Sequence, residues 1–449
     1  MMKHTITFSS YFIKILIIAG LFIALPMLFS FGSNLSTAGS YAVSVLCFFL
    51  LVVISIRLLL GKKYLRFYII AFIIQILIGL IHYLTFVNPD YFNTTGGPSS
   101  LLWHEYHSAF NSIERLIYNR HQNSLFFFDR DDWMVTHPEI WKILTIPTTF
   151  LGHKWMNYAP LNVFSILMAS ANLLIAYNYL NPGEDGDRKN ARKLVMFCTA
   201  YFPLFLLNDT VWRDTFGVFL ISIGLVLMTL SDNTSKKMLS LIVLVYFSFL
   251  LRNVYVFVAV AIYAIKEIRL RNKAANFIIV PIAVAAMIIV SNFFQEKTSD
   301  EYVGLYVNQM SFLALPIKIL FGLIGPFPWT QFMSVFTGRV DVAYQLSDYI
   351  LGVFQIGYLF AVIFNWKSLS FQNPDYMLLM GLGMALSGFI SNAMHIGYIA
   401  EGVFFTLPWF YKQIGSYYKR YFIASLAVLS LLNIVTGIVG SLGFADIWH

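Results

Sequence analysis

The chain has 449 residues, of which 58% are hydrophobic and only 12% charged, and its mean hydropathy is +0.70. Soluble domains carry about 25% charged residues, so this composition excludes an ordinary soluble protein and indicates a polytopic membrane protein. The formal charge of +8 does not point to a nucleic-acid partner, because Lys and Arg lie mostly in short loops between apolar segments. The only cysteines, Cys47 and Cys198, lie within apolar segments and predict no disulfide.

Membrane-spanning segments can be located from apolar length, since a spanning helix needs about 20 apolar residues. The candidate spans are 11–31, 41–61, 67–87, 159–180, 194–208, 213–231, 238–251, 253–265, 274–293, 346–366, 375–393, 396–411 and 421–443. We therefore predict an all-α, polytopic integral membrane protein with about 13 transmembrane helices.

Orientation follows from the basic residues, because cytoplasmic loops are enriched in Lys and Arg. With the N-terminus in the cytoplasm, the inner loops receive Lys62, Lys63, Arg66, Arg188, Lys189, Arg192, Lys193, Lys236, Lys237, Lys266, Arg269, Arg271, Lys273, Lys367, Lys412, Lys419 and Arg420. Residues 88–158, the turns at 209–212 and 252, and the segment 294–345 then lie outside. Gaining or losing one span would invert everything downstream of it.

This plan divides the chain into an N-terminal three-helix membrane segment (1–87), a large extracytoplasmic loop (88–158) and a multi-helix membrane domain (159–449) with the outer segment 294–345. Two apolar pieces are poor spans. Residues 140–151 are short and contain Pro147, and residues 311–324 contain Pro316 and Lys318. We expect both to be interfacial or re-entrant helices on the outer face.

The loop 88–158 begins with a turn-rich piece at 93–98. An amphipathic pattern over 101–118 follows, which predicts a helix lying on the membrane. Glu105 stands near its start, flanked by His104 and His107. A carboxylate in a partly dry cleft beside the bilayer has a raised pKa and can act as a general base or acid. Glu105 and His107 are therefore candidate catalytic residues. The alternative is a carboxylate that only stabilises a helix N-terminus.

An acidic turn follows in the same loop, where Asp129 and Asp131 alternate around Arg130. Two carboxylates so spaced can share a divalent cation, Mg²⁺ or Mn²⁺, that bridges to a phosphate. The alternative is a solvated turn. The loop histidines lack the spacing of a zinc site.

Three later groups place polar residues at the predicted outer boundary. Arg213 and Arg252 sit at breaks between apolar segments. An Arg there either extends to the membrane interface or binds an anion in a cavity. The alternative is an internal pair, Arg213/Asp214 or Arg252 with an Asp. Trp329 belongs to a rigid Gly-Pro-Phe-Pro-Trp turn at the interface. His395 and Glu401, at the outer start of the span 396–411, are expected to line the same cavity as Asp214 and Trp329.

The order of these features resembles polytopic bacterial glycosyltransferases of the C-type fold and the polymerases of surface-polysaccharide assembly. The resemblance rests on Glu105-Tyr-His with Ala109, on Leu161-Asn162, on a Phe-Pro…Arg-Asp hairpin at 202–214, on the Leu-Arg break at 251–252 and on the turn at 325–329. It implies a polyprenyl-phosphate-linked sugar donor and a glycan acceptor at the outer face of the bacterial cytoplasmic membrane, with other polysaccharide-assembly proteins as partners. The catalytic base implied is Glu105, or else Asp131.

The chain departs from that family pattern in two ways: the large loop follows the third helix rather than the first, and Glu replaces the usual Asp. We expect glycosyl transfer or repeat-unit polymerisation. The alternative is a transporter or flippase for a lipid-linked oligosaccharide, which predicts internal repeats and charged residues deep within several spans. A membrane scaffold without catalysis is a third possibility.

Overall fold

The computed structural model describes residues 6–86, 138–152, 157–181, 214–267, 375–390 and 396–414, with isolated helical positions at 357, 360, 364, 420, 421, 423–428, 430 and 431. All regular structure in these residues is helical, as predicted. The chain forms two compact units, unit 1 (Met1–Asn253) and unit 2 (Val254–His449).

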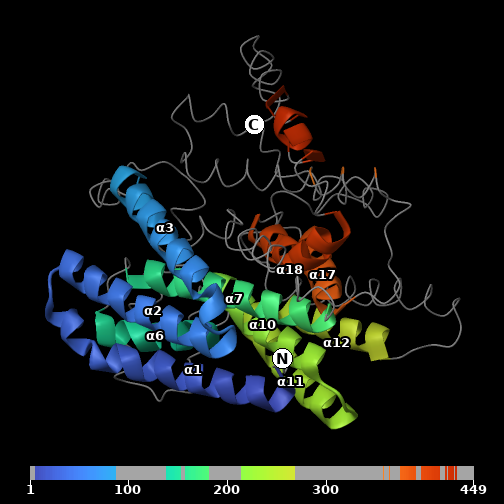
Figure 1. Cartoon of the computed structure of the whole chain (residues 1–449), viewed down its shortest axis with the longest axis horizontal. Coiled ribbons are helices and arrows are strands. Elements are labelled where there is room, and N and C mark those ends of the chain that lie inside the picture. Colours follow the sequence, from blue (N-terminus) through green and yellow to red (C-terminus); the bar gives the residue numbers. More distant parts are fainter. Residues whose placement is uncertain are drawn as a thin grey trace, which may run out of the picture. The chain divides into compact units, whose positions relative to one another are not determined.

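Unit 1 contains seven described α-helices and one 3₁₀ helix. They are α1 (Phe8–Leu28), η1 (Ser30–Asn34), α2 (Thr37–Leu59), α3 (Lys62–Phe86), α6 (Pro138–Leu151), α7 (Tyr158–Leu180), α10 (Asp214–Leu230) and α11 (Thr234–Leu251) (Figure 1). The segment 140–151 is helical, as α6, and its interfacial position stays a prediction. The spans 194–208 and 274–293 and the segment 311–324 lie outside the described residues.

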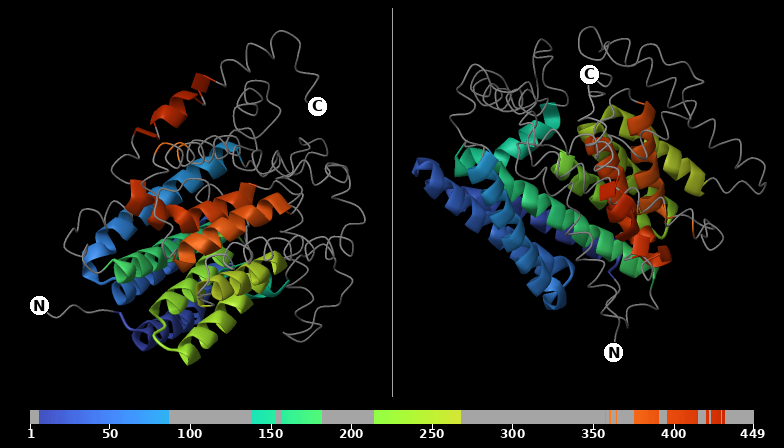
Figure 2. Two further views of the ribbon diagram at one scale, coloured as in Figure 1. Left: turned by 90° about the vertical axis from the view of Figure 1, so that its right-hand side faces the viewer. Right: turned by 90° about the horizontal axis from the view of Figure 1, so that it is seen from above.

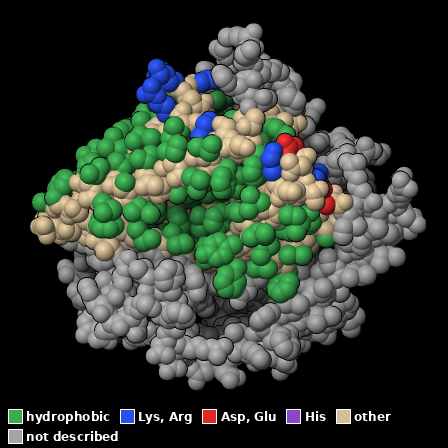
Figure 3. Space-filling view, turned by 90° about the horizontal axis from the view of Figure 1, so that it is seen from below, with side chains coloured by type: hydrophobic (Ala, Val, Ile, Leu, Met, Phe, Trp, Pro, Cys, Tyr) green, Lys and Arg blue, Asp and Glu red, His purple; other side chains and the backbone are tan. Residues whose placement is uncertain are grey.

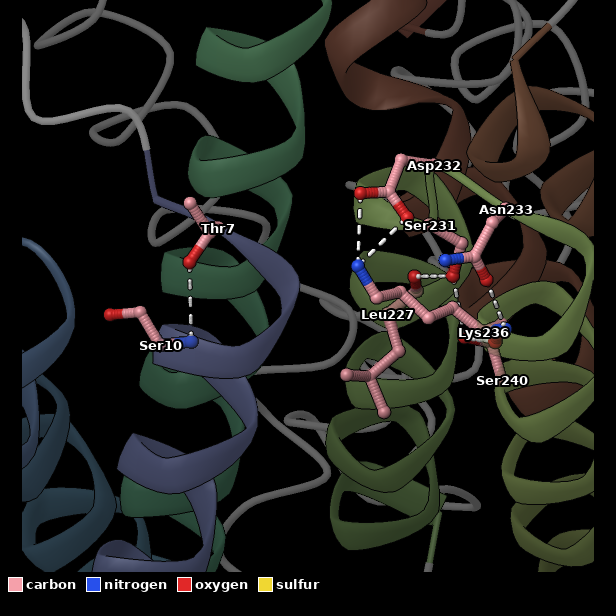
Figure 4. A network of polar contacts seen from close by, with 8 residues as sticks. All are labelled: Thr7, Ser10, Leu227, Ser231, Asp232, Asn233, Lys236 and Ser240. Carbon is pink, nitrogen blue, oxygen red and sulfur yellow. Dashed lines mark hydrogen bonds and ion pairs between the residues drawn. The ribbon is translucent and has the colours of Figure 1, made fainter.

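Side-chain caps explain why several helices begin before their apolar runs. Asn233 caps α11 by accepting the Lys236 amide N–H at 2.9 Å, so α11 starts four residues before the apolar segment at 238. At the same turn the Lys236 ammonium donates to Asp232 at 2.8 Å (Figure 4). It also lies 5.7 Å from the centre of the Phe8 ring of α1. The hydrogen bond from Lys236 holds the pKa of Asp232 below its usual value.

Helix α7 forms the centre of unit 1 and is buried around its whole circumference from Tyr158 to Tyr177, apart from Ala159. It contacts α2, α3 and α10 (Figure 1). An aromatic cluster joins four helices around Phe164, whose ring centroid lies 6.0 Å from that of Phe22, 6.1 Å from Phe48 and 5.8 Å from Phe219. A helix that is apolar on all sides is a core helix, and α7 is the one around which the others pack.

The contacts of α7 fix the directions of its neighbours. Tyr11 of α1 bonds to Asn172, and Phe22 stacks near Phe164, so α1 runs antiparallel to α7. Thr215 of α10 bonds to Asn162, and Ser222 bonds to Asn172, so α10 runs parallel to α7. The connection between α7 and α10 therefore leaves from one end of unit 1 and arrives at the other. The sequence places one candidate span, 194–208, in this connection.

Unit 1 consequently has two chemically different ends. The basic end of unit 1 carries the start of α1, the α2–α3 turn and the α10–α11 turn, with Lys62, Lys63, Arg66, Lys236 and Lys237. The opposite end, which we call the Arg252 end, carries η1, Gly152, Asn157, Asp214 and Arg252. Of the cations assigned to inner loops, the five that the structure describes in unit 1 thus share one end. Which side of a membrane that end faces stays a prediction.

Four described helices are long and apolar enough to cross a membrane: Phe8–Leu28, Ala38–Leu59, Tyr158–Leu180 and Thr234–Leu251. Helices α1 and α11 both lie at the lower edge of unit 1 in Figure 1 and in the left view of Figure 2. Both expose large apolar side chains, among them Leu16 and Leu28 on α1 and Ile242 and Tyr246 on α11. The face in Figure 3 is accordingly a broad hydrophobic area with charged residues at its margin, as expected for a surface in contact with lipid.

Unit 2 contains α12 (Asn253–Glu267), α17 (Tyr376–Ile390) and α18 (Ile396–Ile414) among its described residues. Helices α17 and α18 cross at Gly381 and Gly402, where a Cβ on Gly381 would lie 2.5 Å from the Gly402 carbonyl oxygen. Only glycine allows the two backbones to approach this closely. Helix α12 joins the pair through Val258, whose Cγ1 lies against Gly383.

Candidate functional site

Most of the candidate site residues fall outside the described part of the chain. These are Glu105, His107, Asp129, Asp131, Arg213, Trp329 and His395. The structure describes Asp214 and Arg252, both in unit 1, and Glu401 in unit 2. The structure brings Asp214 and Arg252 together.

Asp214 and Arg252 form a buried ion pair at the Arg252 end of unit 1. The Arg252 Nη2 donates to Asp214 Oδ2 at 3.1 Å, and their side chains are 12% and 2% exposed. Asp214 is the first residue of α10 and Arg252 is the extended C-cap of α11. Each charge also suits its helix terminus, because an anion is stabilised at an N-terminus and a cation at a C-terminus.

This contact is the internal pair that the sequence offered as one interpretation of Arg252. It leaves phosphate binding by Arg252 as a proposal. A guanidinium carries five N–H donors in a planar fork, which is more than a single carboxylate can accept. The Asp214 carboxylate, at 3.1 Å from Arg252 Nη2, orients the guanidinium.

Asparagines on α7 fix α10 beside this pair. Thr215 donates to Asn162 Oδ1 at 3.1 Å, one residue from Asp214. Further along, Asn172 Oδ1 accepts the Tyr11 hydroxyl at 2.9 Å and its Nδ2 donates to Ser222 Oγ at 2.8 Å. All of these side chains are buried, so their hydrogen bonds specify how α1, α7 and α10 pack.

Asn157 anchors the end of α6 at the same end of unit 1. Its Nδ2 donates to the Gly152 carbonyl at 2.7 Å, to Ser40 Oγ at 2.8 Å and to the Leu151 carbonyl at 3.2 Å. Gly152 has φ of 99°, a conformation that disfavours other residues. The final part of the segment 88–158 is thereby attached to α2 and to the start of α7.

Glu401 lies on α18, and its side chain is fully buried. The Tyr255 hydroxyl of α12 donates to Glu401 Oε2 at 2.6 Å. A second bond of the same kind runs from the Tyr376 hydroxyl of α17 to Glu267 at the end of α12. Tyrosine–carboxylate bonds thus hold α12 to α18 and to α17.

Several of these polar residues were not predicted from the sequence, notably Asn157, Asn172 and Tyr255. Asn172 and Tyr255 are marked by an amide or a hydroxyl within an otherwise apolar helix, which in a membrane protein indicates an interhelical hydrogen bond. Asn157 stands just before α7, as its N-cap. Within the described ranges, no group of three or more His, Cys, Asp or Glu side chains is arranged to hold a metal ion. The predicted cation site at Asp129 and Asp131 lies outside those ranges.

Comparison of the chain with protein-family models, curated proteins and solved structures finds no match.

Proposed function

We propose that this chain is a multi-pass enzyme of the bacterial cytoplasmic membrane, with about 13 spans, a cytoplasmic N-terminus and an extracytoplasmic loop 88–158. It transfers a sugar, or polymerises a repeat unit, from a polyprenyl-phosphate carrier onto a glycan acceptor at the outer face. Its product belongs to a surface polysaccharide such as O-antigen or capsule.

The observation that carries this proposal is the buried Asp214–Arg252 pair at one end of an apolar helical unit. A buried ion pair is weak evidence for a purely structural role, because apolar residues of similar volume often give equal or greater stability. Charged side chains beside membrane helices mark functional sites more often than structural ones. A guanidinium held by a carboxylate suits the phosphate of a lipid-linked donor.

A second supporting observation is the position of Asn157. It attaches the end of α6 five residues from Asn162, the partner of Thr215, so the segment 88–158 ends on the side of unit 1 that carries Arg252. Sugar transfer from a lipid phosphate needs a base for the acceptor hydroxyl, a positive group for the departing phosphate and an apolar surface for the lipid. The loop carboxylates, Arg252 and the exposed apolar helices would supply these three parts.

In this mechanism Glu105 takes the proton of the acceptor hydroxyl, with His107 beside it, and Arg252 together with Arg213 binds the leaving phosphate. Asp131 is the alternative base. Asp129 and Asp131 are the residues that would hold a divalent cation, Mg²⁺ or Mn²⁺, which would neutralise charge on the phosphate.

The test compares Glu105→Gln with Asp131→Asn at matched protein abundance, with the surface glycan as readout. If Glu105 is the base, Glu105→Gln lowers the rate by about 10²–10⁴ because the amide cannot accept the proton. If Glu105 only stabilises a helix N-terminus, the change costs about 0.3–1 kcal/mol and product is nearly normal. Product lost only in Asp131→Asn moves the base to the acidic turn. Normal product from both variants contradicts the enzymatic role of this loop.

The surface glycan of cells that lack the gene distinguishes the two reactions that the proposal includes, repeat-unit polymerisation and sugar transfer. Deleting the gene for a polymerase removes the ladder of chain lengths from the surface glycan. Deleting the gene for a transferase that adds a branch removes one side-branch sugar and leaves the ladder.

One observation favours a second candidate, a flippase for a lipid-linked oligosaccharide. Glu401 is fully buried within the apolar helix α18 and bonded to Tyr255, and buried carboxylates in membrane helices are common in transporters. Cells that lack a flippase accumulate the lipid-linked repeat unit on the cytoplasmic leaflet. Cells that lack a polymerase accumulate it on the outer leaflet, so the location of this intermediate decides between the two.

A further inference from the structure

Four exposed cations surround the α2–α3 turn at the basic end of unit 1. Arg57 lies in the last turn of α2, and Lys62, Lys63 and Arg66 lie in the first turns of α3. Gly61, with φ of 77°, connects the two helices within two residues, so these side chains gather around one tight turn. We call these four residues the α2–α3 cation cluster.

Among the described residues, this cluster has no acidic counterpart nearby. The first acidic residue in the sequence is Asp90, so neither α1, α2 nor α3 carries a carboxylate. Of the acidic side chains that the structure describes in unit 1, Asp214 pairs with Arg252 and Asp232 pairs with Lys236. Within the described residues, the four cations form no ion pair. Three of them also lie near the N-terminus of α3, where the helix dipole adds to the positive potential.

The exposed face of α3 indicates which kind of surface the α2–α3 cation cluster contacts. Lys62 and Arg66 are followed, at helical spacing on the same face, by Ile70, Ile73 and Leu77, which are all exposed. Arg66 and Leu77 are separated by 11 residues, or about 16 Å of helix. A stripe with an apolar body and a cationic head fits a bilayer leaflet, with isoleucines in the hydrocarbon and cations at the level of the headgroups.

From these observations we infer that the α2–α3 cation cluster binds anionic phospholipid in the leaflet next to the basic end. The unbalanced charge selects anionic over zwitterionic headgroups, and each such cation near an anionic surface contributes about five-fold in affinity. The apolar stripe selects a lipid over a soluble anion. This inference does not depend on the proposed enzymatic function.

The α10–α11 turn at the same end provides the control. It also carries two lysines, but Lys236 is neutralised by Asp232 at 2.8 Å and packs over Phe8. Lys236→Gln/Lys237→Gln therefore removes as many lysines as Lys62→Gln/Lys63→Gln, but from a turn whose charge is partly balanced.

The test uses the purified full-length protein in a neutral detergent, titrated with phosphatidylglycerol or phosphatidylcholine while thermal unfolding is recorded. We expect phosphatidylglycerol to stabilise the wild type more than phosphatidylcholine does, and added salt to weaken this difference. In Lys62→Gln/Lys63→Gln the lipid concentration for half of the effect should rise at least about five-fold. The Lys236→Gln/Lys237→Gln variant should respond like the wild type.

Three results would overturn the inference. The first is an equal response of the wild type to both lipids. The second is an unchanged phosphatidylglycerol titration in Lys62→Gln/Lys63→Gln. The third is an equal effect of soluble glycerol phosphate, which would indicate a small-anion site instead of a lipid surface. If Lys62→Gln/Lys63→Gln does not fold, the inference is tested with Lys62→Arg/Lys63→Arg and with the salt dependence of the wild type. The charge-conserving variant must then keep the phosphatidylglycerol titration of the wild type.

Discussion

At the scale of single residues, the Asp214–Arg252 pair makes a quantitative prediction. Asp214→Asn keeps the shape of the side chain but leaves the Arg252 charge buried without its carboxylate, and this should cost about 3–5 kcal/mol of unfolding free energy. Denaturation in detergent measures the change. Asp232→Asn is the matched control, because its pair with Lys236 is exposed and its loss should leave stability nearly unchanged.

Variants of Asp214 and Arg252 can distinguish a role of this pair in helix packing from a role in phosphate binding. In Asp214→Asn/Arg252→Gln no buried charge remains, so the double variant should be less destabilised than the sum of the two single changes. Arg252→Lys keeps a cation for Asp214 but lacks the planar fork. If Arg252 binds a lipid phosphate, Arg252→Lys should lose glycan product while keeping most of the stability, and normal product in this variant would contradict phosphate binding.

At the scale of helices, the contact between α10 and α11 depends on glycine. A Cβ on Gly224 would lie 2.9 Å from the Leu244 Cα, and one on Gly217 would lie 2.5 Å from Leu251 Cδ1. Gly224→Ala therefore has to push the α11 backbone away and should cost about 1–3 kcal/mol. Gly20→Ala on α1 is the control, since nothing lies within 4 Å of its added methyl group, and it should be neutral or stabilising. Equal stability of the two variants would show that α10 and α11 do not pack this closely.

Within the described residues, helix positions were predicted well from the sequence and helix partners were not. The segment 159–180 is α7 almost to the residue, because a long apolar run bounded by polar residues leaves few alternatives. Helix α3 begins at Lys62 instead of 67, since a helix extends beyond its apolar part wherever cations can reach the surface. The bond between Tyr11 and Asn172 joins residues 161 apart, and nothing local in either segment indicates the other.

The Asp214–Arg252 pair at the candidate site likewise shows that residue partners were not predictable from the local sequence. Both Arg213 and Arg252 were possible partners of an Asp at this boundary. Within the described residues Asp214 pairs with Arg252, 38 residues away, because the α10–α11 turn returns the end of α11 to the start of α10; Arg213 lies outside those residues. Glu105 and Asp131 lie outside the described residues, so the assignment of the base still depends on sequence alone.

At the scale of the whole molecule, the orientation can be tested directly. The structure places Asn181 at the basic end of unit 1 and Asn157 at the Arg252 end. A reporter that is active only outside the cytoplasm should therefore be active after Asn123 and silent after Asp187. The reverse pattern would invert the orientation, and equal activity at both sites would contradict the separation of the two ends.

The short helix α10 has a consequence for how the protein enters the membrane during synthesis. It has 17 residues, about 26 Å of helix, and begins with an aspartate, so by itself it is a poor substrate for the insertion machinery. Its compensating arginine is made 38 residues later, at the far end of α11. We expect the ribosome-bound chain to hold α10 at the edge of the bilayer until α11 has emerged. The two helices then enter together, so that both charges cross the hydrocarbon as one neutral pair.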